Sequence, residues 1–169
     1  MFGVQMQMVA RGYLTYDLTE NPGLVGIVIG GSAVPMLIFS LFGGVLSDRI
    51  NKKILIQVGQ ISSTLIAIAV AFLIINEMIM WQHLFIAASL QGIGWAFLAP
   101  SRQTIIPQIL PHRLISNGIA LDGTLMGMTS LLAPAVAGIL YALIGPGGVY
   151  VSISVITSFS VITTVFIKY

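Results

Sequence analysis

Long apolar runs that carry almost no charge constrain what this chain can fold into. The 169 residues are 57% hydrophobic and only 7% charged, whereas a soluble domain has roughly 25% charged residues. Runs of this kind can cross the hydrocarbon core of a membrane as helices, which takes about 20 residues each. They lack the alternating pattern of barrel strands of about ten residues. The composition therefore predicts an all-α integral membrane protein.

Polar turns, many with glycine or proline, divide the apolar sequence into six predicted spans. These spans are residues 1–16, 24–46, 54–75, 78–100, 118–144 and 149–167. The first extends only about 24 Å as a helix, against a hydrocarbon core of about 30 Å. We therefore expect it to be the outer part of a first helix whose beginning is absent. The longest polar connection is predicted over residues 101–117, and a tight turn over residues 145–148.

The positions of the basic residues predict which side of the membrane each turn faces. When alternate loops are counted, one side receives Arg49, Lys52, Lys53, Arg102, Arg113 and Lys168. The turns on the other side contain the acids Asp17, Glu20 and Glu77. An excess of lysine and arginine is typical of cytoplasmic loops. The sequence thus predicts a multi-pass protein of the inner (plasma) membrane, with the hairpin around Asp48 in the cytoplasm.

Several classes of function have no support in the sequence. The net charge of +2 comes from bases in membrane loops and does not indicate a nucleic-acid partner. The chain has no cysteine and only two histidines, so we expect no metal site and no cofactor. No Gly-x-Ser-x-Gly or His-Glu-x-x-His motif and no pair of intramembrane aspartates occurs. We therefore do not expect an enzyme.

The hairpin over residues 44–53 is the most distinctive polar motif. Asp48 is predicted at the end of a helix, where the helix dipole disfavours an anion. The bases Arg49, Lys52 and Lys53 that follow it can pair with this carboxylate or with anionic lipid headgroups. Alternatively, these charges only fix the orientation of the hairpin in the membrane. The residues alone leave both interpretations open.

The hairpin and three further motifs resemble parts of the major facilitator superfamily. The order Gly-x-Leu-x-Asp-Arg from Gly44 to Arg49 is similar to the loop between helices 2 and 3 of that family. Residues 7–19 resemble the end of helix 1 in the drug-exporting branch, which includes macrolide and siderophore exporters. Residues 100–121 resemble its connection between helices 4 and 5, and residues 133–138 resemble an element of exporter helix 5.

The resemblance implies a fold that the composition alone does not specify. It implies the six-helix N-terminal bundle of the major facilitator fold, built as a three-plus-three inverted repeat. The first helix would be incomplete and the C-terminal half of the transporter would be absent from this chain. The hairpin residues Gly44, Asp48, Arg49, Lys52 and Lys53 would act as a conformational latch, and Pro134 and Gly138 would belong to the helix-5 packing element.

The resemblance also implies a function and its partners. It implies an efflux secondary transporter, of the antiporter kind, that exports amphipathic small molecules by alternating access. Its partners would be a small-molecule substrate, the lipid bilayer and the missing C-terminal half. A non-transporting membrane scaffold or a homodimerising half-transporter is the alternative.

Four polar residues within or beside the predicted spans are candidates for function. Asp122 lies inside a span, where a carboxylate is costly and by default a functional candidate. Arg102 is its possible partner in ion coupling or in a cytoplasmic gate, although the pair could equally be a structural salt bridge. Gln7 and Arg11 could line a cavity, but we expect Arg11 to extend to the outer interface. Ala88 stands where many proton-coupled members have an arginine, so the coupling ion is not indicated.

Overall fold

Helices make up almost all of the backbone that the computed structural model describes, which is residues 1–49 and 52–165. Side chains are described for residues 1–41, 53–99, 107 and 110–164. The elements are α1 (Phe2–Thr19), α2 (Pro22–Gly30), α3 (Ala33–Arg49), α4 (Lys52–Ile75), α5 (Trp81–Ile109), the short 3-10 helix η1 (His112–Leu114) and α6 (Ile115–Val165). Within these residues there is no strand, so the all-α prediction is confirmed.

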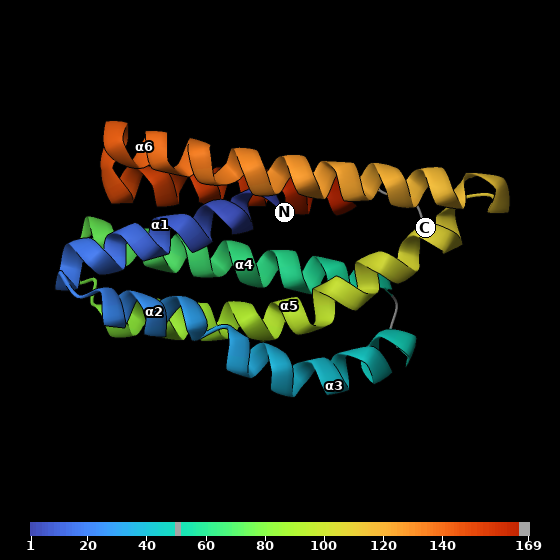
Figure 1. The fold of residues 1–169 in the computed structure, drawn as a ribbon, viewed down its shortest axis with the longest axis horizontal. Helices are drawn as coiled ribbons and strands as arrows, with labels where there is room; N and C mark the ends of the chain where they lie inside the picture. The colour runs from blue at the N-terminus through green and yellow to red at the C-terminus, as the bar shows by residue number, and fades with distance from the viewer. Residues whose placement is uncertain (50–51, 166–169) are drawn as a thin grey trace.

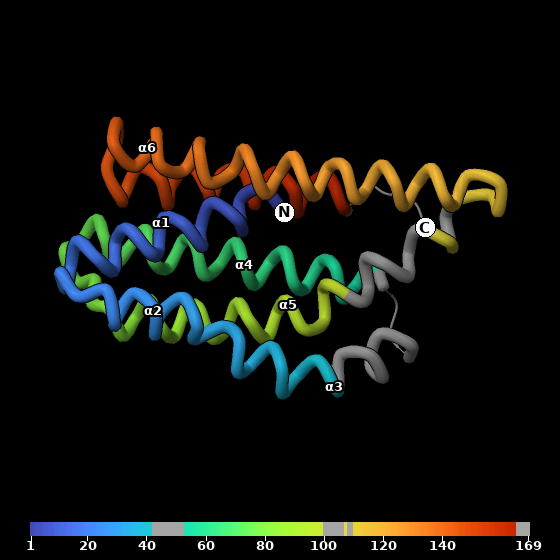
Figure 2. The backbone as a smooth tube through the Cα atoms, in the orientation of Figure 1, coloured from blue at the N-terminus to red at the C-terminus, as the bar shows by residue number. Residues whose placement is uncertain are grey.

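The long helices lie roughly parallel and antiparallel to one another in a bundle (Figure 1). The turn from α1 to α2, the turn from α4 to α5 and a reversal within α6 lie at one end of the bundle. The end of α3, the start of α4 and the connection from α5 to α6 lie at the other end. α6 packs on α1 and α4, and α5 packs on α3 and α4. Figure 2 shows that α1 begins midway along the bundle.

The turn between α1 and α2 is shorter than the sequence predicts. α1 continues through Thr19, and Glu20 ends it in the left-handed conformation with φ 48°. The side chain of Asn21 accepts a hydrogen bond from the Gly23 backbone N–H at 2.8 Å. Pro22 occupies the first turn of α2, where its missing N–H costs nothing. Only two residues, Glu20 and Asn21, therefore separate the end of α1 from the start of α2.

The second predicted span, residues 24–46, is two helices with a break between them. α2 ends at Gly30 and α3 starts at Ala33, so the chain bends at Gly31 and Ser32. The Ser89 hydroxyl on α5 donates to the freed carbonyl oxygen of Gly31 at 3.1 Å. Gly92 lies one turn further along α5, and a Cβ there would collide with backbone atoms of Ser32. The break is therefore held by a partner helix that lies far away in the sequence.

The connection between α5 and α6 also differs from the prediction. The sequence predicts a polar connection over residues 101–117, but α5 continues as a helix through Ile109. Only η1 and its flanking residues separate α5 from the start of α6 at Ile115. Prolines such as those in α5 are tolerated in membrane helices when neighbouring groups satisfy the freed backbone. Proline and charge together are therefore weak signals for the end of a helix in this chain.

The reversal within α6 depends on a single residue. Gly145 has φ 69° and ψ 177°, and the residues on both sides of it are helical. This backbone conformation is essentially confined to glycine. Pro146 begins the returning helix, where a fixed φ is favourable. The reversal therefore lies within the predicted turn over residues 145–148. Only Gly145, the first residue of that turn, leaves the helical conformation.

We expect Gly145→Ala to destabilise the chain by about 1–3 kcal/mol, because a Cβ strains this backbone conformation. Gly147→Ala is the matched control, since a Cβ there would meet the Ile74 side chain at an ordinary 3.5 Å. The measurement is the denaturant midpoint of the purified chain in detergent. Equal midpoints for the two variants would contradict the role assigned to Gly145.

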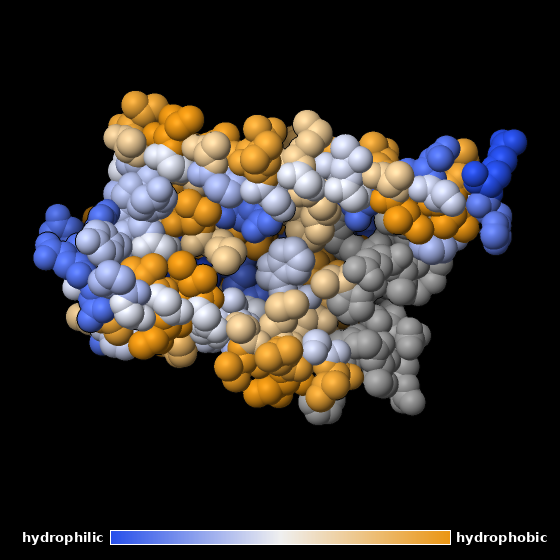
Figure 3. All heavy atoms as spheres, viewed as in Figure 1, coloured by the Kyte–Doolittle hydropathy of each residue, from blue (hydrophilic) through white to orange (hydrophobic). Residues whose placement is uncertain are grey.

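The core contains many alanines, and the surface around it is largely apolar. Alanines on four helices, Ala10, Ala67, Ala87 and Ala137, lie in the core, which lets the helices approach closely. Figure 3 shows apolar side chains along the sides of the bundle and hydrophilic ones gathered at its two ends. Within the described residues, three segments are long and apolar enough to cross a membrane: Pro22–Leu41, Lys53–Ile75 and His112–Thr164. The chain is a membrane protein.

Candidate functional site

A polar face on α1 is buried inside the bundle. Gln7, Arg11 and Thr15 follow one another at intervals of four residues, which places them on one side of a helix. All three side chains are buried, and Arg11 is only 4% exposed. The Thr15 hydroxyl donates to the Arg11 carbonyl oxygen at 2.8 Å. Polar side chains here are costly in an apolar medium unless other groups satisfy them.

Hydrogen bonds connect this face to two neighbouring helices. Arg11 Nη2 donates to Gln91 Oε1 on α5 at 2.8 Å. Gln91 Nε2 donates to Ser63 Oγ on α4 at 3.2 Å. Gln7 Nε2 donates to the Ser63 carbonyl oxygen at 3.3 Å. We name Gln7, Arg11, Ser63 and Gln91, together with Tyr150, the buried polar cluster.

Tyr150 brings the returning half of α6 into the buried polar cluster. Its side chain is fully buried, and its hydroxyl lies close enough to the Arg11 guanidinium to interact with it electrostatically. Three buried polar atoms of the cluster have no hydrogen-bond partner among the described residues: Gln7 Oε1, Arg11 Nε and the Tyr150 hydroxyl oxygen. An incompletely satisfied buried polar group is a candidate for function.

The position of Arg11 corrects an expectation from the sequence. We expected this side chain to extend to the membrane interface, but it is buried and bonded to Gln91. In the described part of the chain, only neutral groups hydrogen-bond to its guanidinium. A buried cation within a membrane bundle is expensive and marks a functional site by default. Sequence analysis missed Ser63, Gln91 and Tyr150, whose only signal is a polar group within an apolar run.

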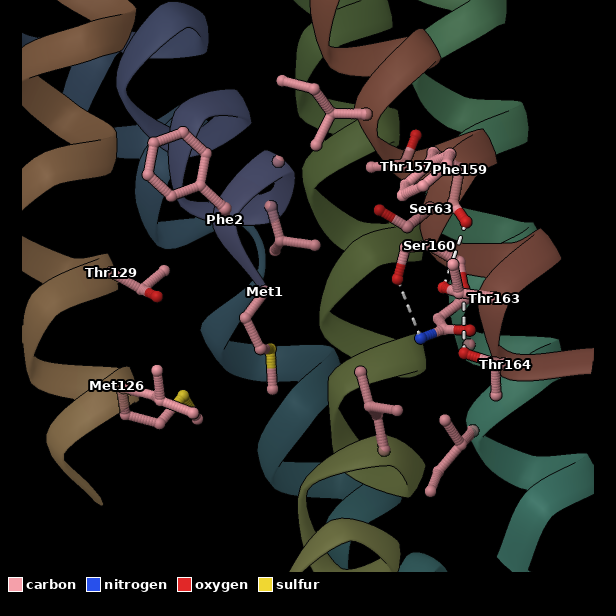
Figure 4. Close-up of a pocket in the computed structure, with 18 of the residues that line it drawn as sticks. Met1, Phe2, Ser63, Met126, Thr129, Thr157, Phe159, Ser160, Thr163 and Thr164 are labelled. Carbon is pink, nitrogen blue, oxygen red and sulfur yellow. Dashed lines mark hydrogen bonds between the residues drawn. The ribbon is translucent and has the colours of Figure 1, made fainter. Parts of the chain in front are cut away.

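A cavity of about 660 Å³ lies beside the buried polar cluster. Figure 4 shows Met126 and Thr129 of α6 on one side of it and Ser63 and Ser160 on the other. Met1 and Phe2, at the start of α1, lie between these two walls. Ser63 belongs both to the cavity wall and to the cluster. The cavity is therefore one side chain away from the Gln91 amide that holds Arg11.

The cavity wall is apolar with a few fixed polar atoms. Gln60 Nε2 donates to Ser160 Oγ at 3.1 Å, whereas Gln60 Oε1 is buried without a partner. The hydroxyls of Thr157 and Thr164 donate to carbonyl oxygens of their own helix. A cavity of this size with few polar groups is typical of small-molecule sites. Its chemistry suits a molecule that is mostly apolar with one or two hydrogen-bonding groups.

A second, more open groove of about 640 Å³ follows the other face of α1. Its lining consists of Gln5, Met8, Val9, Gly12, Tyr13 and Tyr16 from α1, Pro22, Val25 and Ile29 from α2, and Pro134 from α6. The Gln5 amide donates to the Ser130 hydroxyl at 3.1 Å, which joins α1 to α6 along this groove. α1 thus presents a polar face to the core and a face of methionine and tyrosine to the groove.

The remaining sequence-predicted residues are distributed over the bundle. Lys53 is half-buried and lines the cavity, Asp122 is half-buried near the start of α6, and Gly138 has open space around its Cα. The backbone places Gly44, Asp48 and Arg49 near the end of α3, Lys52 at the start of α4 and Arg102 within α5. The side chains of these last five lie outside the described residues. Their roles, and cavity lining by Gln7 and Arg11, stay predictions.

Comparison with known proteins gives the family. The profile of the transmembrane secretion effector family matches residues 1–168. Macrolide efflux protein A of Streptococcus pyogenes is 26% identical over 76% of this chain and 33% of its own length. The staphyloferrin A transporter of Staphylococcus aureus is 27% identical over 73% of this chain and 31% of its own length.

A Mycobacterium tuberculosis protein named as a probable multidrug-efflux transporter is 33% identical over 69% of this chain and 26% of its own length. The chain thus spans about a third or less of the relatives it matches. The family profile, by contrast, covers nearly all of the chain. The chain therefore belongs to the transmembrane secretion effector family of the major facilitator superfamily.

Proposed function

We propose that this chain is the six-helix half of a secondary transporter that exports amphipathic small molecules by alternating access. α2 and α3 would together make one membrane crossing and α6 would make two, which gives six with α1, α4 and α5. The observation that carries the proposal is the cavity of about 660 Å³ that meets the buried polar cluster at Ser63. The names of three relatives, which describe efflux or transport, support it.

The surface of the chain supports a missing second half as its partner. Gly123 and Gly127 on α6, and Gly26 and Gly30 on α2, have nothing within 4 Å of an added Cβ. Each pair has a spacing of four, which leaves a strip without side chains on one helix face. Such strips let another helix approach closely in a membrane. We assign them to contacts with the C-terminal half, while the other apolar sides face lipid.

We assign two groups of charges to the transport cycle. The hairpin of Gly44, Asp48, Arg49, Lys52 and Lys53 would be the latch between the two halves at the cytoplasmic side of the plasma membrane. Asp122, with Arg102 as its partner, would form a gate or a coupling site at the same end of the bundle. Each carboxylate can exchange one cationic partner for another between two conformations, which is what alternating access needs.

The proposal predicts efflux of a lipophilic cationic dye from cells that express this chain together with the C-terminal half proposed as its partner. We expect wild type to lower dye accumulation, and Asp48→Asn and Asp122→Asn each to abolish most of this effect because the charge pairs are lost. Glu77→Gln is the matched control, since Glu77 lies in the turn between α4 and α5, away from both groups. No efflux of dye by wild type, or full efflux by both variants at equal expression, would contradict the proposal.

A further inference from the structure

We propose that the end of α1 near Thr19 carries a recognition site for lipophilic organic cations, formed by Asp17 together with Tyr13, Tyr16 and Tyr141. This inference rests on the proposed export function, because it names the class of substrate that the transporter would take. It is independent of the cavity of Figure 4 and of the buried polar cluster.

The first observation is the contact between α1 and α6 at this end of the bundle. The Tyr141 hydroxyl donates to Asp17 Oδ2 at 2.5 Å. The rings of Tyr13 and Tyr141 lie with their centroids 5.5 Å apart and are tilted by 34°. Tyr13 and Asp17 are four residues apart on α1, so they share one side of the helix. A carboxylate is thereby fixed beside two aromatic rings from different helices.

The second observation is that two tyrosines of α1, Tyr13 and Tyr16, border a groove. Tyr13 and Tyr16 line the groove of about 640 Å³ on the open face of α1, and their side chains are 53% and 50% exposed. Met8 extends the same wall. Cations are attracted to the faces of aromatic rings, and methionine adapts its shape to irregular apolar ligands. The groove can therefore hold the apolar substituents of a cation, and Tyr13, which lines it, also contacts Tyr141, the residue that bonds Asp17.

The third observation is the sign of the charge at this site. The Asp17 side chain is exposed, and among the described residues Tyr141 is the only group that donates a hydrogen bond to it. Arg11 belongs to the buried face of α1 and is bonded to Gln91. Lys53 and Arg113 belong to elements at the opposite end of the bundle (Figure 1). The local field is therefore negative, which favours a cation and disfavours an anion of the same shape.

The test is equilibrium binding of tetraphenylphosphonium to the purified chain in a zwitterionic detergent, with binding to protein-free micelles subtracted. Tetraphenylborate is the matched probe, because it has nearly the same size and shape and the opposite charge. We expect wild type to bind the cation at least about tenfold more tightly than the anion, which corresponds to about 1.4 kcal/mol. Equal or tighter binding of tetraphenylborate would overturn the proposal.

Two variants test whether the cation binds at this site. We expect Asp17→Asn, which keeps the size of the side chain, to weaken binding of the cation about tenfold, while Glu20→Gln leaves it within about twofold. Glu20 follows on the same helix end, so it controls for a general surface potential. A similar loss in both variants, or no loss in Asp17→Asn, would reject the site.

A second variant keeps the test valid if loss of Asp17 disturbs folding. Tyr13→Leu retains the carboxylate and its hydrogen bond to Tyr141 but removes one aromatic face. We expect about fivefold weaker binding of tetraphenylphosphonium and unchanged binding of tetraphenylborate. Unchanged binding of the cation would count against the site.

The outcomes separate this inference from the proposed function. If cells expel dye but the purified chain shows no preference for the cation, the exporter proposal stands and the cation site fails. If the chain selects the cation through Asp17 but cells expel nothing, the binding site stands and the export function fails.

Discussion

Gln91→Leu is expected to destabilise the chain by about 3–5 kcal/mol, although the new side chain is similar in size and suits an apolar environment. The reason is that Gln91 Oε1 accepts a hydrogen bond from the Arg11 guanidinium at 2.8 Å inside the bundle. Its loss leaves a buried cation without that partner. The measurement is the unfolding midpoint and slope of the purified chain in mixed micelles with increasing denaturing detergent.

The double variant Arg11→Leu/Gln91→Leu is the decisive control for this prediction. It removes both the charge and the acceptor, so we expect it to recover most of the stability lost in Gln91→Leu. Ser63 then loses one hydrogen bond from Gln91, which should cost only about 1 kcal/mol. If the double variant were as unstable as the sum of the single variants, the energetic link between Arg11 and Gln91 would be refuted.

Gly92→Ala is expected to cost about 3 kcal/mol, an unusually large effect for the addition of one methyl group. The added Cβ would collide with the carbonyl oxygen, the carbonyl carbon and the Cα of Ser32 at the break between α2 and α3. These are backbone atoms, which cannot rotate away as a side chain can. α5 would therefore have to move away from the break, and the hydrogen bond from Ser89 to Gly31 would be lost with it.

Gly94→Ala is the matched control for this second prediction. It lies two residues further along α5, and a Cβ there would meet the Ser62 hydroxyl oxygen at an ordinary 3.5 Å. We expect an effect within about 1 kcal/mol, since alanine also favours the helix by a similar amount. The same denaturation experiment measures both variants. A similar loss in both would show that helix α5 is sensitive to any added methyl group.

The helical fold could be predicted because its signals are local. Apolar runs specify membrane helices wherever they occur, and Gly145 followed by Pro146 marks a reversal within two positions. The break at Gly31 could not be predicted in this way. It depends on Ser89 and Gly92, about 60 positions later, and such long-range contacts leave no pattern near the break itself.

Some features of the candidate site could likewise be predicted from the sequence, and others could not. The polarity of Gln7 and Arg11 within an apolar stretch identified them as candidates, but their surroundings were misjudged. A long basic side chain near the end of a span usually reaches the interface, whereas Arg11 has a buried acceptor that is supplied 80 positions later. The only signal from Tyr150 is its polar atom within an apolar run, and a tyrosine in a span is usually an ordinary packing residue. The roles of Asp48 and Arg102 stay predictions.

The polar face of α1 has a consequence for synthesis of the protein. α1 is made before the other described helices, yet it is not among the three apolar segments found in the described residues, and its buried face carries Gln7 and Arg11. The groups that satisfy this face, Ser63 and Gln91, are translated much later. Stable residence of α1 in lipid on its own would be costly. Its lateral release from the insertion machinery is therefore expected to wait until α5 has been made.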